Sequence, residues 1–139
     1  MTREQALALR AQMEETFAVA APNMTVQMLI QNRALCAKWE EGAHKADEIR
    51  TVEGYPYKCR QEHDTTEHPD IVPGSTAWAT FWIPFHGTSA ETALPFVQPT
   101  GAHDMYLADE YAAFDVGVKK CIRDTAYNYT DDPTAWEDA

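Results

Sequence analysis

Apolar side chains near the N-terminus recur every three or four residues, which places them on one face of an α-helix. They are Ala6, Leu9, Met13, Phe17 and Ala20. Thr2 and Gln5 have the spacing of a capping box, and Pro22 cannot continue a helix. The pattern therefore predicts a helix over residues 2–20. Because the apolar face is narrow, we expect it either to pair with another helix or to pack against the rest of the chain.

A second, shorter helix is predicted over residues 25–38, where the apolar positions form a mixed pattern. From residue 39 onward the pattern changes to short apolar runs separated by turn-forming residues. All six glycines, seven of the eight prolines and fourteen of the fifteen aromatic residues lie between 39 and 139. Such a composition is typical of short strands joined by turns, with aromatic rings filling a small core.

The same part of the chain contains an internal repeat, which indicates two structural units of one kind. Two matches share a shift of 62 residues, from 46 to 108 and from 58 to 120. They are Ala46-Asp47-Glu48 with Ala108-Asp109-Glu110, and Lys58-Cys59 with Lys120-Cys121. Two further matches keep the order at other spacings. They are Gly42-Ala43-His44 with Gly101-Ala102-His103, and Ala77-Trp78 with Ala135-Trp136.

The repeat divides the chain into four parts. We expect an N-terminal helical segment at 1–38, a first module at 39–84, a linker at 85–95 and a second module at 96–139. Each module should contain three strands. The expected strands are 48–51, 55–61 and 77–83 in the first module, and 110–114, 118–122 and 134–137 in the second. The fold class is therefore mainly β with an α-helical N-terminus.

The charge balance limits the choice of partners. The formal net charge is −11 at pH 7, and no basic stripe is present. This argues against a nucleic-acid partner and, more weakly, against anionic surfaces. The longest apolar run is too short to cross a membrane, and the charged N-terminus does not resemble a secretion signal. We therefore expect a protein made in the cytoplasm with no membrane partner.

The three cysteines cannot all pair within one chain, and Cys59 and Cys121 occupy equivalent repeat positions. We expect buried thiols that behave as small apolar residues. Cys59, His63 and His68 have a spacing that zinc could use, but no histidine follows Cys121. Because a structural metal should serve both units, we expect neither a metal nor a cofactor.

The repeat resembles a known group, the small chitin-binding-type modules appended to bacterial chitinases, and in particular the tandem copies of phage and prophage tail-associated proteins. The first module shows Tyr57-Lys58-Cys59, Pro69-Asp70 and Trp78. The second opens with Phe96-Val97-Gln98-Pro99-Thr100-Gly101-Ala102-His103-Asp104-Met105-Tyr106. The resemblance implies two three-stranded antiparallel modules in a virion protein that adheres to a host-surface polysaccharide.

Carbohydrate binding by such modules uses exposed aromatic faces that stack on sugar rings. The candidate sugar-binding residues are Tyr55, Tyr57, Trp82, Tyr127 and Tyr129. The expected core residues are Trp39, Cys59, Trp78, Cys121 and Trp136. Fewer aromatic residues on the second module suggest that the first does most of the binding.

No nucleophile elbow, phosphate loop or zinc-protease helix is present, so we expect a protein that is not an enzyme and has no catalytic residues. Two functions remain open. One is that the modules bind a glycan; the alternative is that they connect proteins of a phage tail, baseplate or capsid with no sugar binding. In either case we expect other virion proteins as partners, and a homo-oligomer through the N-terminal helix.

Overall fold

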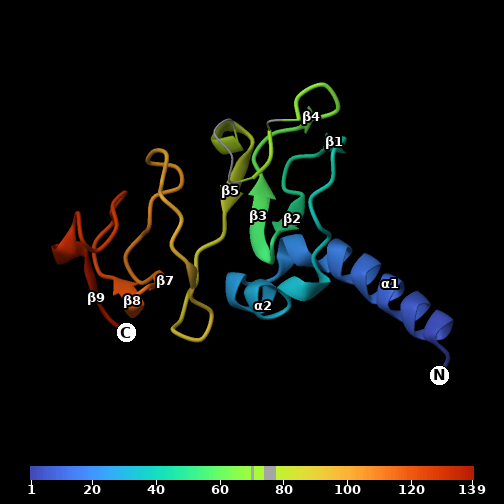
Figure 1. Cartoon of the computed structure of the whole chain (residues 1–139), viewed down its shortest axis with the longest axis horizontal. Coiled ribbons are helices and arrows are strands. Elements are labelled where there is room, and N and C mark those ends of the chain that lie inside the picture. Colours follow the sequence, from blue (N-terminus) through green and yellow to red (C-terminus); the bar gives the residue numbers. More distant parts are fainter. Residues whose placement is uncertain (70, 74–77) are drawn as a thin grey trace.

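The computed structural model describes residues 1–69, 71–73 and 78–139, without the side chains of Pro22 and Trp78. Within these residues the chain is mainly β, with an N-terminal helix followed by several small sheets (Figure 1). The helical segment, the first sheet and the second sheet follow one another along the long axis, so the two termini lie far apart. Asp70 and Ala77, two residues of the proposed repeat, lie outside the described part.

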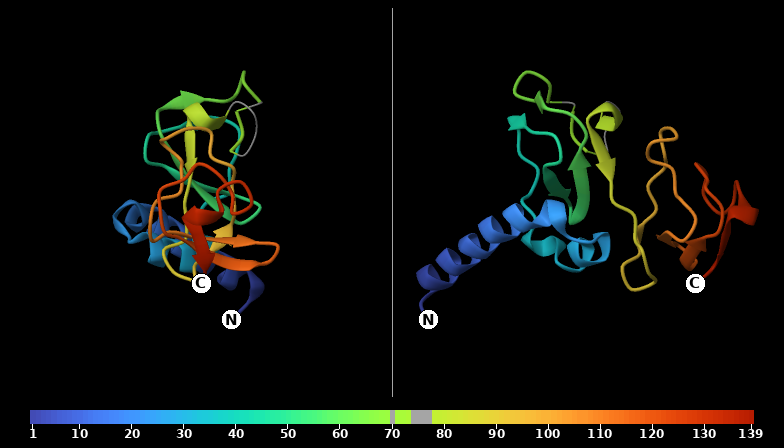
Figure 2. Two further views of the ribbon diagram at one scale, coloured as in Figure 1. Left: turned by 90° about the vertical axis from the view of Figure 1, so that its left-hand side faces the viewer. Right: turned by 180° about the vertical axis from the view of Figure 1, so that it is seen from behind.

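Helix α1, Arg3–Ala20, confirms the predicted N-terminal helix and its capping box. The Thr2 hydroxyl accepts a hydrogen bond from the Gln5 amide at 3.1 Å, and the Gln5 side chain accepts one from the Thr2 amide at 2.8 Å. Phe17 is the buried residue of this helix, and the N-terminal end projects away from the sheets (Figure 2). Among the described helices, none has the length and apolar character needed to cross a membrane.

The C-terminal end of α1 packs on a short helix, α2, Val26–Gln31, which begins at the Thr25 cap. The buried cluster there consists of Phe17, Ala21, Leu29 and Cys36, with Ile49 of the first module and Phe85, the residue after β5, packed against it. The second predicted helix is therefore shorter than expected. It ends at Asn32, whose side-chain amide donates to the Met28 carbonyl at 2.8 Å, and a 3₁₀ turn follows.

The first module is built on an antiparallel sheet of β2, Ile49–Val52, β3, Tyr55–Cys59, and β5, Trp82–Pro84. Glu53 and Gly54 form the β2–β3 turn with positive φ angles of 51° and 80°. Short strands β1, Ala43–His44, and β4, His63–Asp64, pair beside this sheet. The third strand begins later than predicted, because residues 78–80 form a 3₁₀ turn.

The second module contains four strands: β6, Leu94–Pro95, β7, Tyr111–Phe114, β8, Gly117–Cys121, and β9, Trp136–Asp138. Strand β6 is parallel to β7, whereas the other pairs are antiparallel.

Strand β6 comes from the segment predicted to be a linker, so that segment is part of the second sheet. The Gly87 carbonyl accepts a hydrogen bond from the Tyr111 amide at 2.9 Å. A Cβ atom on Gly87 would lie 2.6 Å from the Thr92 carbonyl oxygen, so this close approach requires glycine.

The two modules share the backbone geometry that the 62-residue shift predicted. Asp47 and Asp109 have positive φ angles of 69° and 76°. Their amides donate to the carbonyls of Cys59 and Cys121 at 2.9 and 2.7 Å. The repeat is therefore a structural repeat from the turn before β2 to the end of β3.

The tryptophan in the last strand of each module does not follow the sequence match of Trp78 with Trp136. In the first sheet Cys59 lies opposite Trp82, and in the second Cys121 lies opposite Trp136. Trp82, rather than Trp78, is therefore the equivalent of Trp136. The Gly-Ala-His match is also incorrect: His44 pairs with His63 as Tyr106 pairs with Thr125, so His103 is not the counterpart of His44.

Candidate functional site

Two of the five candidate sugar-binding rings are buried in the first module. Trp82 is 0% exposed and packs against the edges of His44 and His63, with ring centroids 5.2 and 5.6 Å away. Tyr57 belongs to the same buried cluster. Neither ring has a face on which a sugar could stack, which corrects their assignment as exposed platforms. The error arose because the sequence match aligned Trp78, and not Trp82, with the core residue Trp136.

A third candidate, Tyr55, lies at the joint between the two modules. Its hydroxyl donates to the Phe85 carbonyl at 2.9 Å, and its ring contacts that of Tyr57 at a centroid distance of 5.1 Å. Burial is the main reason that the pKa of Tyr55 is raised above its ordinary value. Tyr55 therefore contributes to packing rather than to an open surface.

Tyr127 is the most exposed of the five rings, with 58% of its surface accessible, and it lies in the second module. Its backbone is held on both sides. Its amide donates to the Thr125 hydroxyl at 3.1 Å, and its carbonyl accepts a hydrogen bond from the Trp136 indole at 3.0 Å. The core tryptophan of this module thus fixes the loop that presents Tyr127 to solvent.

Tyr129, two residues further on, is half-buried at the edge of the same core. Its ring meets the Phe114 ring edge-on at 4.9 Å, and its hydroxyl donates to Asp115 at 3.1 Å. The Lys119 ammonium group lies 5.0 Å from the ring centroid, within the range of a cation–π contact. Tyr129 is therefore a fixed, partly accessible ring beside Tyr127 in the sequence.

Asp132 fixes the C-terminal end of the loop 125–132, which carries Tyr127 and Tyr129. Its carboxylate accepts hydrogen bonds from the Thr125 hydroxyl and the Arg123 guanidinium, both at 2.7 Å. These contacts lower the pKa of Asp132, with the Thr125 hydrogen bond as the larger cause. Residues 125–132 form a braced loop, which reduces the entropy that a ligand would have to remove on binding.

Four of the expected core residues can be placed. Cys59, Cys121 and Trp136 are buried, and Trp39 is half-buried. The two thiols occupy equivalent positions, and burial raises the pKa of Cys59 to about 11. The buried-thiol prediction is confirmed, and Cys36 is also a buried free thiol. The side chain of Trp78 lies outside the described part of the chain.

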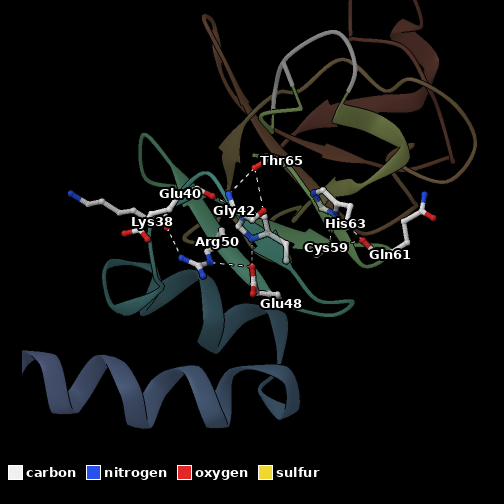
Figure 3. A network of polar contacts seen from close by, with 10 residues as sticks. Lys38, Glu40, Gly42, Glu48, Arg50, Cys59, Gln61, His63 and Thr65 are labelled. Carbon is white, nitrogen blue, oxygen red and sulfur yellow. Dashed lines mark hydrogen bonds and ion pairs between the residues drawn. The ribbon is translucent and has the colours of Figure 1, made fainter. Parts of the chain in front are cut away.

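A polar network around the buried His44 links the helical segment to the first module (Figure 3). His44, 1% exposed, bonds through one ring nitrogen to Glu48 and through the other to the Glu40 carbonyl at 2.7 Å. Arg50 donates to Glu48 at 3.1 Å and to the Lys38 carbonyl at 2.9 Å. Both nitrogens of His44 have partners within the protein, so we assign this network to holding β1 and β2 against the preceding segment.

The possible zinc ligands Cys59 and His63 both contact the Gln61 carbonyl oxygen. The Cys59 sulfur lies 3.1 Å from it, the His63 Nδ1 lies 2.8 Å from it, and the two side-chain atoms are 3.6 Å apart. Within the described residues, no three His, Cys, Asp or Glu side chains are grouped in a way that could hold a metal ion.

The joint between the modules contains a pair of stacked rings, a histidine–glutamate hydrogen bond and an apolar contact. The rings of His86 and Tyr106 are parallel within 9°, with centroids 3.7 Å apart, and His86 bonds to Glu110 at 2.9 Å. Val97 lies in residues 96–106, the seam that opens the second module, and packs against the core cluster of the first module. The Val97 contact connects the two modules directly, whereas the His86 contacts hold the predicted linker against the second module.

A groove of about 770 Å³ lies between the helical segment and the β2–β3 hairpin. We call it the cationic groove, because Arg10, Arg33 and Lys38 line it together with Trp39. Its walls come from α1, the 3₁₀ turn after α2 and the hairpin. The sequence analysis did not predict this groove. Its lining residues are far apart in the sequence and form no local motif, and the net charge of −11 does not indicate a positively charged site.

Comparison of the sequence with protein-family models and with curated proteins identifies no relative from which a function could be transferred. No protein-family model matches the chain, and no curated protein shows significant sequence similarity to it.

Proposed function

We propose that this protein is a non-catalytic, virion-associated phage protein that adheres to a host-surface polysaccharide through two modules of the chitin-binding type. The resemblance of the seam motif and of the repeat supports the family part of this proposal. The observation that carries the binding part is Tyr127, a largely exposed ring on a loop fixed by Trp136 and Asp132. Weak stacking on such a ring becomes useful when a virion displays many copies.

The binding surface is therefore assigned to the second module, in contrast to the expectation from the sequence. Tyr127 would stack on a sugar ring, and Tyr129 would contribute its accessible edge. Polar groups of the same loop, among them Asn128 and Asp131, could hydrogen-bond to sugar hydroxyls. Tyr57 and Trp82, both buried, would support the first module.

Replacing Tyr127 with alanine tests this assignment. We expect about a tenfold loss of affinity for chitin oligosaccharides or another neutral glycan that the intact protein binds, since a stacked ring contributes about 1.4 kcal/mol. The measurement is a glycan array with the protein displayed on beads, followed by titration. Ile122→Ala, which removes another exposed apolar side chain from the same module, is the matched control. Equal binding by both variants would contradict the assignment.

The competing proposal is a structural connector in a tail, baseplate or capsid, and the exposed face of α1 favours it. Leu9 and Met13 are 45% and 46% exposed, and they belong to the same apolar face of the helix as the buried Phe17. The N-terminal part of α1 extends beyond the body of the protein (Figure 1), where a second helix could cover these side chains.

Charge placed on this face tests the connector role. Leu9→Glu with Met13→Glu should convert a homo-oligomer to a monomer of 15.7 kDa, measured by size exclusion with light scattering. Leu7→Glu with Ala11→Glu adds the same charge at the same spacing on the opposite face of the helix, and it should leave the oligomer intact. A monomeric wild type would refute oligomerisation through α1. Point variants are preferable to deleting residues 1–21, because Phe17 and Ala21 belong to the core.

A further inference from the structure

We propose that the cationic groove is a second binding site and that it accepts an acidic saccharide, a sugar bearing a carboxylate or phosphate group. This inference deepens the proposed adhesion function, and it depends on that function for the sugar part of the ligand. The groove is separate from the Tyr127 surface, because it lies between the helical segment and the first module. Four features of its walls support the proposal.

The first feature is the local charge. Three of the eleven lysine and arginine residues of the chain line this groove, and Glu53 is its single acidic lining residue. Arg33 and Lys38 form no ion pair with any described carboxylate, whereas most other basic side chains are paired. Two unneutralised cations in one concave surface favour an anionic ligand.

The second feature is that the groove is already formed. Arg10 donates to the Ala34 carbonyl at 3.2 Å, and Arg33 donates to the Ile30 carbonyl at 2.8 Å, so both guanidinium groups are positioned by backbone atoms. Arg50 donates a hydrogen bond to the Lys38 carbonyl, while the Lys38 side chain extends away from the network (Figure 3). A ligand would therefore need to order few additional side chains.

The third feature is the aromatic wall. Trp39 lines the groove and is half-buried, with its ring stacked on that of His44 at a centroid distance of 6.1 Å. The Trp39 amide donates to the Thr51 carbonyl at 2.9 Å, which fixes the backbone of this wall. An indole beside cationic groups suits a ligand with both an apolar ring face and negative charge, as in an acidic sugar.

The fourth feature is the net charge of the whole protein, which favours an acidic sugar over a nucleic acid as the ligand. The net charge of −11 repels a densely charged polymer, in which one charge occurs about every 1.7 Å of duplex. At physiological ionic strength, charges more than about 8 Å apart are largely screened, so the groove can still attract a small or sparsely charged ligand. We therefore assign the site to an acidic saccharide.

Removal of the two unpaired cations tests the site. We expect the full-length protein to bind a galacturonate oligomer in isothermal titration calorimetry, more tightly at low salt. Arg33→Gln with Lys38→Gln should weaken this binding about tenfold, because charge-assisted hydrogen bonds are lost. Both residues are exposed, so the fold should be retained, as checked by circular dichroism.

The matched control is Arg3→Gln with Lys45→Gln, which removes the same two charges from exposed positions outside the groove. It should bind like the wild type. An equal loss in both double variants would show attraction without a site and would overturn the proposal. Equal binding of an oligothymidylate of matched charge would also overturn it, since the groove would then accept any polyanion. A glycerol phosphate oligomer in place of galacturonate distinguishes phosphate from carboxylate recognition.

The outcomes also separate this inference from the proposed function. Binding of neutral glycans that depends on Tyr127, with no binding of either acidic oligomer, would refute the groove and leave adhesion intact. Binding of an acidic oligomer that depends on Arg33 and Lys38, with no Tyr127-dependent glycan, would refute the surface on the second module and keep the groove.

Discussion

Replacing Trp82 with alanine is expected to lower the free energy of unfolding by about 3 to 5 kcal/mol, the cost of removing a large aromatic side chain from a core. Trp82 is 0% exposed, lies opposite Cys59 in the sheet and contacts the rings of both His44 and His63. A module of this size has little other core to compensate. Urea denaturation followed by circular dichroism gives the measurement.

Phenylalanine substitutions refine this prediction. The Trp82 indole nitrogen is buried and has no hydrogen-bond partner among the described residues, so Trp82→Phe should cost less than about 1.5 kcal/mol. The equivalent change, Trp136→Phe, removes the hydrogen bond to the Tyr127 carbonyl, so it should cost more and should also weaken glycan binding. A loss below about 1 kcal/mol for Trp82→Ala would show that Trp82 is not the core residue of the first module.

The second large effect is expected at Asp104, in the seam that opens the second module. Its carboxylate, 2% exposed, accepts hydrogen bonds from the Thr100 amide and hydroxyl, both at 2.9 Å, and from the Gly101 amide at 3.0 Å. Asp104→Ala should therefore destabilise the protein by about 3 kcal/mol, since hydrogen bonds to a charged group are lost and buried donors are left unpaired.

Hydrogen exchange measured by mass spectrometry should locate this effect in residues 96–106, where Phe96 stacks on Tyr106 with centroids 5.1 Å apart. Asp104→Asn keeps the shape of the side chain and one acceptor oxygen, so it should fall between the wild type and Asp104→Ala. His103→Ala is the control, because its nearest ring nitrogen lies 3.9 Å from the carboxylate. Equal protection of the seam in the wild type and Asp104→Ala would contradict the prediction.

Local signals in the sequence predicted the elements that form from neighbouring residues. The capping box and apolar spacing located α1, and the predicted strands 48–51 and 55–61 located the first hairpin. The 62-residue shift correctly aligned the segments that contain Cys59 and Cys121, because a hairpin with a tight turn keeps a fixed length. These features depend on contacts within a few residues of one another.

The closing strands could not be aligned in the same way. In the first module residues 60–81 separate β3 from β5, whereas residues 122–135 separate β8 from β9 in the second. A loop can change its length at a small entropic cost without changing the ladder that it closes. The 62-residue shift therefore does not align the strands that follow the loop, and the sequence match pairs Trp136 with Trp78 instead of Trp82.

The sequence alone determined the helical N-terminus, the β-rich remainder, the repeat and the acidic charge, since these follow from short-range periodicity and from composition. Only the tertiary structure decided which aromatic rings face solvent, because burial depends on residues distant in the chain. It buried Trp82 and left Tyr127 exposed. It also brought Arg10, Arg33 and Lys38 together around Trp39 and placed the predicted linker in the second sheet.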